Sequence, residues 1–455
     1  MGLFAEISLA AWMSLLALTI VVIISCINED VNVGFLSVAF GIVVGGIWVG
    51  MSAVKVMNTF PLSLFMILVG VTFLFALAST NGTMDKVAAY SLRVCGGKTA
   101  WLPLIIYLIV TILTTIGPGN IAATALVAPI AMAIATRVGI SAFLMTLLVV
   151  GAANGAAFSP FAPTGIISNG IIARMVPQLP IIQETWTLDH LAWKIAFNSE
   201  YCQGIINIGG FLLMGGWIWI KKRRALTINI DELAPKPEPF TLKQWYTIIA
   251  IFLLILFVIV PALPFMQGVL RKEVLNLLTN VGSVAFILAG VLMLLNAGDS
   301  KSAVKAMPWS VIMLVCGVTV LIEVMDRAGG LNAMVKMIGA TSGPVSVNFW
   351  LGLWTGLISA YSSSSGVVMP MFLPLVPGLA KEVAGADVIA MISSINIGSH
   401  LVDTSPLSTL GALCIACAGE HEDKQKLFRN LLIWGLSMSI VGALACLLFF
   451  GILGW

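Results

Sequence analysis

Long apolar stretches alternate with short polar ones along most of the chain. Each apolar run is close to the roughly 20 residues that cross about 30 Å of hydrocarbon as a helix. Such runs lie at 7–27, 33–50, 60–78, 200–220, 245–264, 276–297, 307–325 and 427–453. Two longer stretches, 101–176 and 347–418, are also apolar but are interrupted by Gly, Pro, Ser and Asn. This pattern predicts an all-α membrane protein.

Composition strengthens this prediction. Hydrophobic residues make up 59% of the 455 residues and charged residues only 9%, whereas a soluble domain carries roughly 25% charged residues. The net charge of +3 is small, and the basic residues form short clusters between apolar runs, which is typical of membrane topology and not of a nucleic-acid surface. We therefore expect a multi-pass protein of the inner (plasma) membrane that contacts lipids and has no nucleic-acid partner.

The two halves of the chain resemble each other. Residues 70–74 match 317–321 at an offset of 247, and Ser159-Pro160 with Gly165 matches Ser405-Pro406 with Gly411 at an offset of 246. Weak similarity at a nearly constant offset indicates an internal duplication. Interrupted helices at matching positions of two copies are typical of secondary transporters.

A linker rich in Pro and charge, at 221–243, separates the halves. We predict about ten crossings plus two re-entrant hairpins, and placing Lys221–Arg224 in the cytoplasm makes the two repeats inverted. A topology in which both hairpins cross fully is the alternative. The expected order is scaffold helices 1–59, repeat 60–220 (hairpin 101–136, interrupted helix 142–176), linker 221–243, connecting scaffold helices 244–306, and repeat 307–455 (hairpin 347–381, interrupted helix 386–418).

Four polar breaks interrupt the two long stretches, at 114–120, 153–165, 359–366 and 396–406. Non-helical backbone cannot face lipid, because each unpaired N–H or C=O costs several kcal/mol there. The breaks are therefore expected to line a cavity or to bind a ligand. Ser159-Pro160 and Ser405-Pro406 each fit an N-cap followed by Pro at the first helical position. Every break is expected to start a helix whose free N–H groups point at a shared centre.

The breaks contain no Lys or Arg. Each helix start supplies roughly half a positive charge, so four converging starts with Ser, Thr and Asn donors would suit a dianion. Backbone and side-chain oxygens at the same breaks would suit Na⁺. Local physics thus predicts a cation-coupled anion carrier.

Structural alternatives exist for several of these positions. Gly117-Pro118-Gly119 could kink a buried helix. The run Ser362–Ser365 could be a seam for close helix packing. Asn154 and Asn396 could cap helix ends instead of binding an ion or substrate.

Two titratable residues occur in the fourth break. Asp403 is the only acid in the four breaks, and an acid within a membrane is a functional candidate by default. It could bind a cation, exchange a proton, or support the helix start that follows it. His400 could titrate near neutral pH, or it could be a hydrogen-bonded structural residue.

A resemblance to a known family follows from the N-terminal region. The stretches Asn32-Val33-Gly34-Phe35-Leu36, Phe60-Pro61-Leu62-Ser63-Leu64-Phe65, Gly70-Val71-Thr72-Phe73-Leu74-Phe75 and Asn81-Gly82-Thr83-Met84-Asp85-Lys86 resemble the malonate/C4-dicarboxylate carriers of the MatC type. The whole chain resembles the ion-transporter superfamily that includes the divalent-anion:sodium symporters. The resemblance implies a homodimer whose transport domain moves as an elevator against a fixed scaffold. It also implies Na⁺-coupled transport of malonate, succinate or a similar dicarboxylate.

In that family two hairpin tips carry Ser-Asn-Thr motifs that hold the substrate carboxylates. The matching positions here are 119–121, where only the Asn is retained, and 364–366, where Asn and Thr are both missing. The predicted substrate-binding residues are Gly119, Asn120, Ile121, Ser159, Thr164, Ser364, Ser365, Gly366, Ser405 and Thr409. The predicted Na⁺ ligands are Thr115, Gly117, Asn120, Asn154, Gly155, Ser362, Ser363, Asn396, Gly398 and Asp403.

Two further function classes compete with this prediction. One is a cation/proton antiporter or an H⁺-coupled anion carrier that uses Asp403, although an antiporter is expected to need a second buried acid. The other is an intramembrane enzyme, which needs a nucleophile–base pair or metal ligands. The three dispersed histidines, at 190, 400 and 421, do not supply them. We expect no enzyme activity and no cofactor other than Na⁺ as the coupling ion.

Overall fold

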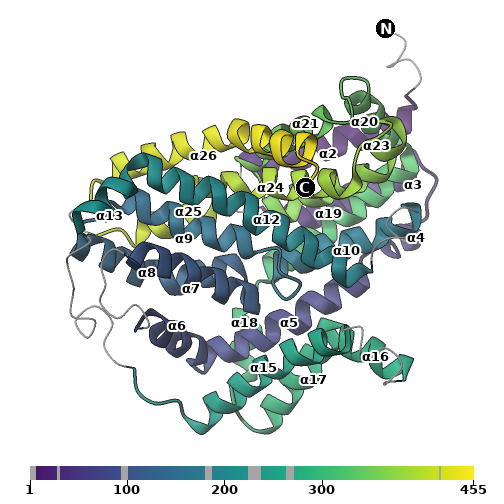
Figure 1. Ribbon diagram of the computed structural model, residues 1–455. Coiled ribbons are helices and arrows are strands. Elements are labelled where there is room, and N and C mark those ends of the chain that lie inside the picture. The colour runs from purple at the N-terminus through teal and green to yellow at the C-terminus, as the bar shows by residue number, and fades with distance from the viewer. Residues whose placement is uncertain are drawn as a thin grey trace.

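The structure, a computed structural model, describes residues 7–27, 31–93, 101–179, 187–223, 237–262, 271–419 and 422–455. Within these ranges the chain forms helices and no strands (Figure 1). The predicted all-α class is therefore confirmed. The predicted linker is described only at its two ends, because 224–236 lies outside the described residues.

The first half contains the following helices in chain order. They are α2 (Leu9–Ile27), α3 (Val33–Ile47), α4 (Ala53–Met57), α5 (Leu62–Thr80), α6 (Thr83–Arg93), α7 (Leu102–Ile116), α8 (Gly119–Val138), α9 (Ala142–Ala156), α10 (Pro163–Met175), α12 (Leu188–Phe211) and α13 (Trp217–Arg223). A 3₁₀ turn, Val176–Gln178, follows α10, and a π-helical turn, Leu212–Gly216, joins α12 to α13.

The second half repeats this order. It contains α15 (Leu242–Ala262), α16 (Lys272–Thr279), α17 (Val281–Leu294), α18 (Ser300–Ala306), α19 (Trp309–Ala328), α20 (Gly330–Gly339), α21 (Ser346–Ser359), η5 (Ser364–Val368), α22 (Met369–Phe372), η6 (Leu373–Leu375), α23 (Val376–Glu382), α24 (Val388–Leu401), η7 (Val402–Thr404), α25 (Thr409–Ala416), α26 (Lys424–Cys446) and η8 (Leu447–Ile452).

Many of these helices have the length and composition of membrane spans. Five are long and apolar enough by themselves: Leu62–Thr80, Gly119–Val138, Leu188–Lys222, Trp309–Ala328 and Lys424–Ile452. Six shorter apolar helices accompany them in the described ranges. Short apolar helices are expected where a crossing is interrupted, because two half-helices then share the thickness of the bilayer.

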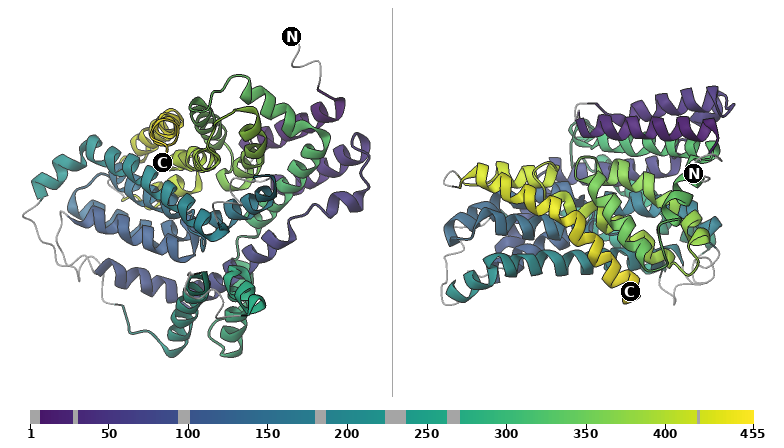
Figure 2. Two further views of the ribbon diagram at one scale, coloured as in Figure 1. Left: turned by 45° about the vertical axis from the view of Figure 1, so that its right-hand side comes forward. Right: turned by 90° about the horizontal axis from the view of Figure 1, so that it is seen from above.

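Two pairs of glycines bring helices of the two halves into close contact. A Cβ on Gly317 of α19 would lie 2.0 Å from the backbone oxygen of Gly34 in α3. A Cβ on Gly70 of α5 would lie 2.7 Å from the backbone oxygen of Gly282 in α17. Only glycine permits such close backbone approach, as in other membrane helix pairs. Figure 2 shows the result, with the purple N-terminal helices beside the green helices of the second half.

The duplication is visible in the interrupted helices. The pair α9 and α10 recurs as α24 and α25, with a break at 157–162 and at 402–408. A Cβ on Gly165 would lie 2.0 Å from the backbone oxygen of Ser159, and a Cβ on Gly411 would lie 2.1 Å from that of Ser405. The matching Ser-Pro and Gly positions in the two halves thus share one physical cause, a turn folded tightly against the following helix.

The Ser-Pro pairs do not begin helices, in contrast to the prediction. The helices that follow start later, at Pro163 with Ala162 as N-cap and at Thr409 with Ser408 as N-cap. Ser159 Oγ accepts a hydrogen bond from the N–H two residues ahead (3.3 Å), and Ser405 Oγ does the same (3.2 Å). Each serine therefore closes a short turn around its proline.

The second and fourth breaks also begin later than predicted. Asn154 and Gly155 lie inside α9, and Asn396 and Gly398 lie inside α24. In these segments the backbone N–H and C=O groups are hydrogen-bonded within the continuing helix. The breaks occur only where Pro160 and Pro406 remove a backbone donor.

The first and third breaks are the turns of helical hairpins. The helix α7 ends at Ile116 and α8 begins at Gly119, while α21 ends at Ser359 and the chain turns helical again at Ser364. Gly117 has φ of 140°, and a Cβ there would lie 2.3 Å from the ring of Phe75. Glycine is required at this tip both by the backbone angle and by the neighbouring ring.

Candidate functional site

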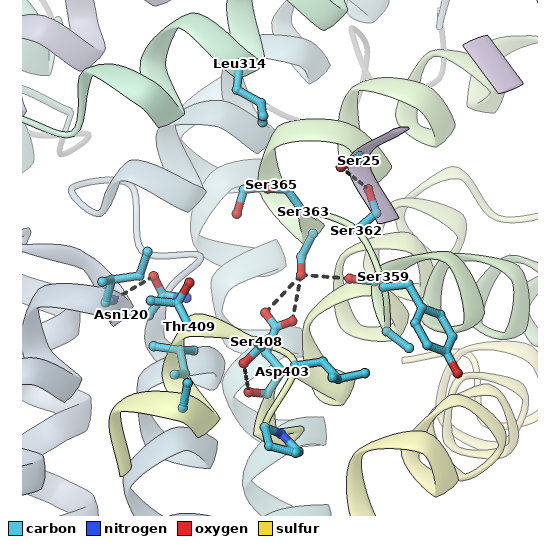
Figure 3. Close-up of a pocket in the computed structure, with 18 of the residues that line it drawn as sticks. Ser25, Asn120, Leu314, Ser359, Ser362, Ser363, Ser365, Asp403, Ser408 and Thr409 are labelled. Atoms are coloured by element: carbon cyan, nitrogen blue, oxygen red, sulfur yellow. Dashed lines mark hydrogen bonds between the residues drawn. The ribbon is translucent and has the colours of Figure 1, made fainter. Parts of the chain in front are cut away.

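A cavity of about 490 Å³ lies where the two hairpin tips approach the fourth break (Figure 3). Its volume falls within the roughly 300–1,000 Å³ of small-molecule sites. The second tip contributes 359–365, the fourth break contributes Asp403 and 406–410, and the first tip contributes Asn120 and Ile121. The remaining lining residues are Ser25, Val31, Ser310, Leu314 and Ala412.

The structure brings part of the predicted set together here. The predicted residues that line the cavity are Asn120, Ile121, Ser362, Ser363, Ser364, Ser365, Asp403 and Thr409. The predicted residues that do not line it are Thr115, Gly117, Gly119, Asn154, Gly155, Ser159, Thr164, Gly366, Asn396, Gly398 and Ser405. Two residues of this second group, Asn154 and Thr164, contact lining residues from behind the wall.

Asn154 supports the first tip from behind. Asn120 Nδ2 donates to Asn154 Oδ1 (3.1 Å), and Asn154 Nδ2 donates to the backbone oxygen of His400 (3.0 Å). One buried amide therefore ties the tip of the first hairpin to the interrupted helix of the second half. Asn154 is neither a helix cap nor a cavity residue, but a link between the two repeats.

Asn396 of α24 also forms a hydrogen bond to the other half of the chain. Its Nδ2 donates to Ser168 Oγ on α10 (2.9 Å). Its Oδ1 is buried and has no hydrogen-bond partner among the described residues. Asn154 and Asn396 thus both bind across the repeat boundary.

Asp403 is buried, with 8% of its surface exposed, at the floor of the cavity. Ser364 Oγ lies 2.8 and 3.0 Å from the two carboxyl oxygens. Ser359 Oγ lies 2.7 Å from Ser364 Oγ and 2.5 Å from the backbone oxygen of Ser399. Ser408 Oγ donates to the backbone oxygen of Asp403. A chain of hydroxyls therefore leads from the carboxyl group into the protein.

Counting hydrogens in this chain constrains Asp403. The backbone oxygen of Ser399 only accepts, so it takes the single hydroxyl hydrogen of Ser359. Ser364 has one hydrogen for two contacts, with Ser359 and with Asp403. The chain is complete when Asp403 carries a proton and donates it to Ser364, which then donates to Ser359. A proton on Asp403 would thus supply a hydrogen for the contact between Ser364 and Ser359.

Sequence reasoning missed a second acid, Glu200, because it lies in an otherwise apolar run. Tyr107 Oη donates to Glu200 Oε1 (3.0 Å), and Thr111 Oγ1 lies 3.4 Å from the same oxygen. Glu200 Oε2 is buried without a partner among the described residues, and a Cβ on Gly155 would lie 2.5 Å from it. An acid within an apolar run was the signal available in the sequence. The chain therefore has a second acid, half-buried overall and with Oε2 enclosed, that was not expected from the sequence.

The cavity wall also contains polar residues that the breaks did not predict. Ser25 Oγ on α2 lies 3.1 Å from Ser362 Oγ on the second tip. Ser310 of α19 accepts hydrogen bonds from Asn32 Nδ2 through its backbone oxygen (2.9 Å) and its Oγ (3.2 Å). Ser25 and Ser310 lie on helices outside the hairpins, and no motif in the neighbouring sequence indicates that they line a cavity.

Metal ligands of the usual kind do not gather in the described ranges. There, no group of three or more His, Cys, Asp or Glu side chains is placed to hold a metal ion. Cys414 and Cys417 are not joined to each other or to another described cysteine.

Residues 9–157 match the family model described as the N-terminus of the dicarboxylate carrier protein MatC. No curated protein matches the chain significantly. Among solved structures, the chain is similar to the YdaH transporter of Alcanivorax borkumensis, whose crystal structure is described as revealing an unusual topology. The identity is 15%, the alignment covers 98% of each chain, and the TM-score is 0.58. The predicted resemblance to MatC-type carriers is thereby confirmed over 9–157, and the fold is one that a transporter has.

Proposed function

We propose that this chain, which carries a MatC-type N-terminal region, is a secondary transporter of a small dicarboxylate such as malonate or succinate, coupled to Na⁺. The cavity between the hairpin tips is the observation that carries the proposal. Its described lining is rich in hydroxyl groups and contains no Lys or Arg. Three helix starts border it, those of α8, of the second hairpin arm at Ser364, and of α25. Helix starts and hydroxyl donors suit carboxylates.

The negative charge of an ionised Asp403 explains why binding of the anion would require a bound cation. A dianion and an ionised Asp403 would share one cavity whose described lining holds no cationic side chain. Two unit charges about 8 Å apart repel by about 2 kcal/mol at an effective dielectric constant of about 20. A dianion doubles this cost. A cation bound at Asp403 removes the repulsion, so binding of the cation and of the anion are coupled.

A proton is the second candidate for the coupling ion. The hydrogen count along Asp403, Ser364 and Ser359 favours it, because the chain is complete only with a proton on Asp403. A protonated Asp403 removes the same repulsion as a bound Na⁺. The anion would then be carried with H⁺ in place of Na⁺.

Uptake by proteoliposomes separates these possibilities. Radiolabelled malonate and succinate are offered under an inward Na⁺ gradient at equal pH, and under an inward proton gradient without Na⁺. Accumulation under Na⁺ alone supports Na⁺ coupling, and accumulation under the proton gradient alone supports H⁺ coupling. Absence of accumulation under both gradients, from protein that is monodisperse in detergent, contradicts the proposed function.

A cation/proton antiporter without organic substrate is favoured by one observation, the second acid Glu200. The same vesicles, loaded with a pH-sensitive dye and given Na⁺ but no dicarboxylate, test it. Proton movement that needs Na⁺ and no dicarboxylate would assign the chain to this class instead.

The mechanism and assembly belong to the same proposal. We infer an elevator movement in which the hairpins and interrupted helices shift against the scaffold helices. We also infer a homodimer in the inner membrane, on the resemblance to the symporter superfamily. Such a movement would break the contact between Ser25 of α2 and Ser362 of the second hairpin tip.

A further inference from the structure

His400 contacts the second hairpin tip from behind the cavity wall. It is completely buried in α24. Its Nε2 lies 3.1 Å from Ser365 Oγ, and Ser365 lines the cavity. The ring of Phe158 packs edge-on against the imidazole, with centroids 4.8 Å apart. The imidazole therefore has a fixed position from which to orient one cavity hydroxyl.

The contacts of Nδ1 decide which nitrogen carries the hydrogen. Nδ1 lies 3.1 Å from the backbone oxygen of Asn396 and 2.9 Å from Ser399 Oγ. Ser399 Oγ in turn donates to the same backbone oxygen (3.0 Å). A carbonyl oxygen only accepts, so a hydrogen on Nδ1 satisfies it, whereas a bare Nδ1 would place two lone pairs against each other. The hydrogen is therefore on Nδ1, and Nε2 is an acceptor.

The orientation of Ser365 follows from this tautomer. Nε2 needs a donor, and Ser365 Oγ is the donor within reach. The single hydroxyl hydrogen of Ser365 then points away from the cavity, and its oxygen lone pairs are left for the cavity side and for Thr164 Oγ1, which lies 3.5 Å away. A lone pair attracts a cation and repels a carboxylate.

We propose that His400 is a positioning residue that holds Ser365 Oγ as a cation ligand, not as a donor to the substrate. The inference rests on the proposed function and moves Ser365 from the substrate site to the coupling-ion site. The donors for the carboxylates are then the helix starts and the remaining hydroxyls of the cavity. With the opposite tautomer, Nε2 would donate to Ser365 and release its hydrogen toward the substrate.

A spectroscopic test reads the tautomer directly. The chain has three histidines, so the double variant His190→Gln/His421→Gln leaves His400 as its sole histidine. Two-bond ¹⁵N–¹H correlations of this variant, labelled with ¹⁵N-histidine in detergent micelles, should show a protonated Nδ1 and a bare Nε2. A protonated Nε2 with a bare Nδ1 overturns the inference. This measurement does not depend on transport.

A binding test reads the role of Ser365. Thermal unfolding of the purified protein is followed against NaCl at constant ionic strength with choline chloride, and against malonate at saturating NaCl. In Ser365→Ala, we expect the half-saturating Na⁺ concentration to rise about tenfold or more, as for the loss of one contact to a charged group. The half-saturating malonate concentration should stay within about twofold. Ser437→Ala, which removes a hydroxyl of α26 that donates to the backbone oxygen of Trp434 and does not line the cavity, is the matched control and should change neither.

Two variants of His400 complete the test. His400→Leu cannot accept the Ser365 hydrogen and should reproduce the Na⁺ defect of Ser365→Ala. His400→Gln keeps an acceptor oxygen and should recover most of the Na⁺ response. A selective loss of malonate affinity in Ser365→Ala, or a wild-type protein that Na⁺ does not stabilise, would contradict the inference. Failure of uptake with an intact Na⁺ response would contradict only the proposed function.

Discussion

At the residue scale, the proposed coupling depends on Asp403. Asp403→Asn keeps the size of the side chain, and its amide can donate to Ser364 Oγ, but it removes both the negative charge and the exchangeable proton. If Na⁺ is the coupling ion, we expect the Na⁺ concentration for half-maximal uptake to rise at least about tenfold, as for a lost charged ligand. If a proton is the coupling ion, a proton gradient should no longer drive accumulation, while exchange of internal for external malonate persists.

The control for Asp403→Asn is Asp387→Asn. Asp387 is exposed and caps α24, where its Oδ1 accepts from Ala390 N (2.7 Å). Asparagine is an equally good N-cap, so uptake should not change. If uptake by Asp403→Asn keeps the ion dependence of the wild type, Asp403 has no role in coupling.

Asn120 is the residue of the first tip that both lines the cavity and bonds to Asn154, which links this tip to the other repeat. Asn120→Ala removes a cavity amide and the 3.1 Å hydrogen bond to Asn154. We expect uptake of malonate to fall by at least about tenfold, because a lost contact to a charged carboxylate is worth roughly that factor. The protein should remain folded, as checked by its elution from a size-exclusion column. Asn58→Ala, which changes an exposed asparagine at the end of α4 outside the cavity lining, should retain the uptake.

At the scale of the element, the interrupted helices depend on glycines packed against a turn. Gly411→Ala would place a methyl group 2.1 Å from the backbone oxygen of Ser405, and backbone cannot move aside cheaply. We expect a loss of about 2 kcal/mol or more of stability, seen as a lower midpoint of thermal unfolding in detergent. Gly165→Ala should behave alike, because its Cβ would lie 2.0 Å from the backbone oxygen of Ser159.

Gly209→Ala is the matched control in a helix. No atom lies within 4 Å of a Cβ at this position of α12. Alanine is favoured over glycine in helices by up to about 1 kcal/mol, so the midpoint should stay or rise. Equal melting of Gly411→Ala and the wild type would show that the turn can open without cost.

At the scale of the whole molecule, the cavity is closed partly by α2 and α19 and partly by the second tip. Ser25 of α2 lies against Ser362, and Leu314 of α19 packs so closely on Gly366 that a Cβ there would lie 1.5 Å from its Cδ2. An elevator movement must separate these contacts. Scaffold and tip would therefore meet in one state of the cycle and part in another.

A cross-link across this contact tests the movement. We expect Ser25→Cys/Ser362→Cys to form a disulfide on oxidation, because the two hydroxyl oxygens lie 3.1 Å apart. The locked protein should lose uptake, and a reducing agent should restore it. The experiment is done in a background without the seven native cysteines, with each single cysteine as control. Full uptake in the cross-linked protein would show that the tip does not leave α2.

Local signals in the sequence determined the membrane class, the duplication and the two hairpin turns. The lengths of the apolar runs and the Gly117-Pro118-Gly119 turn depend on neighbouring residues alone, so they can be read from the chain. The Ser-Pro pairs were located correctly as breaks but interpreted wrongly as helix starts, because a serine before proline can close a turn as well as cap a helix. The matching glycines Gly165 and Gly411 gave the repeat its clearest signature.

Only the tertiary structure decided which break residues share the cavity. Asn154 and Asn396 both lie in the helix that precedes an interruption, yet Asn154 supports a tip and Asn396 binds α10. The carboxyl group of Glu200 has one enclosed oxygen only because α7, α9 and α12 pack around it. The direction in which a side chain points depends on how helices far apart in the sequence are rotated against one another. The hydropathy of a segment indicates that its helix is buried, but not which residues its buried face contacts.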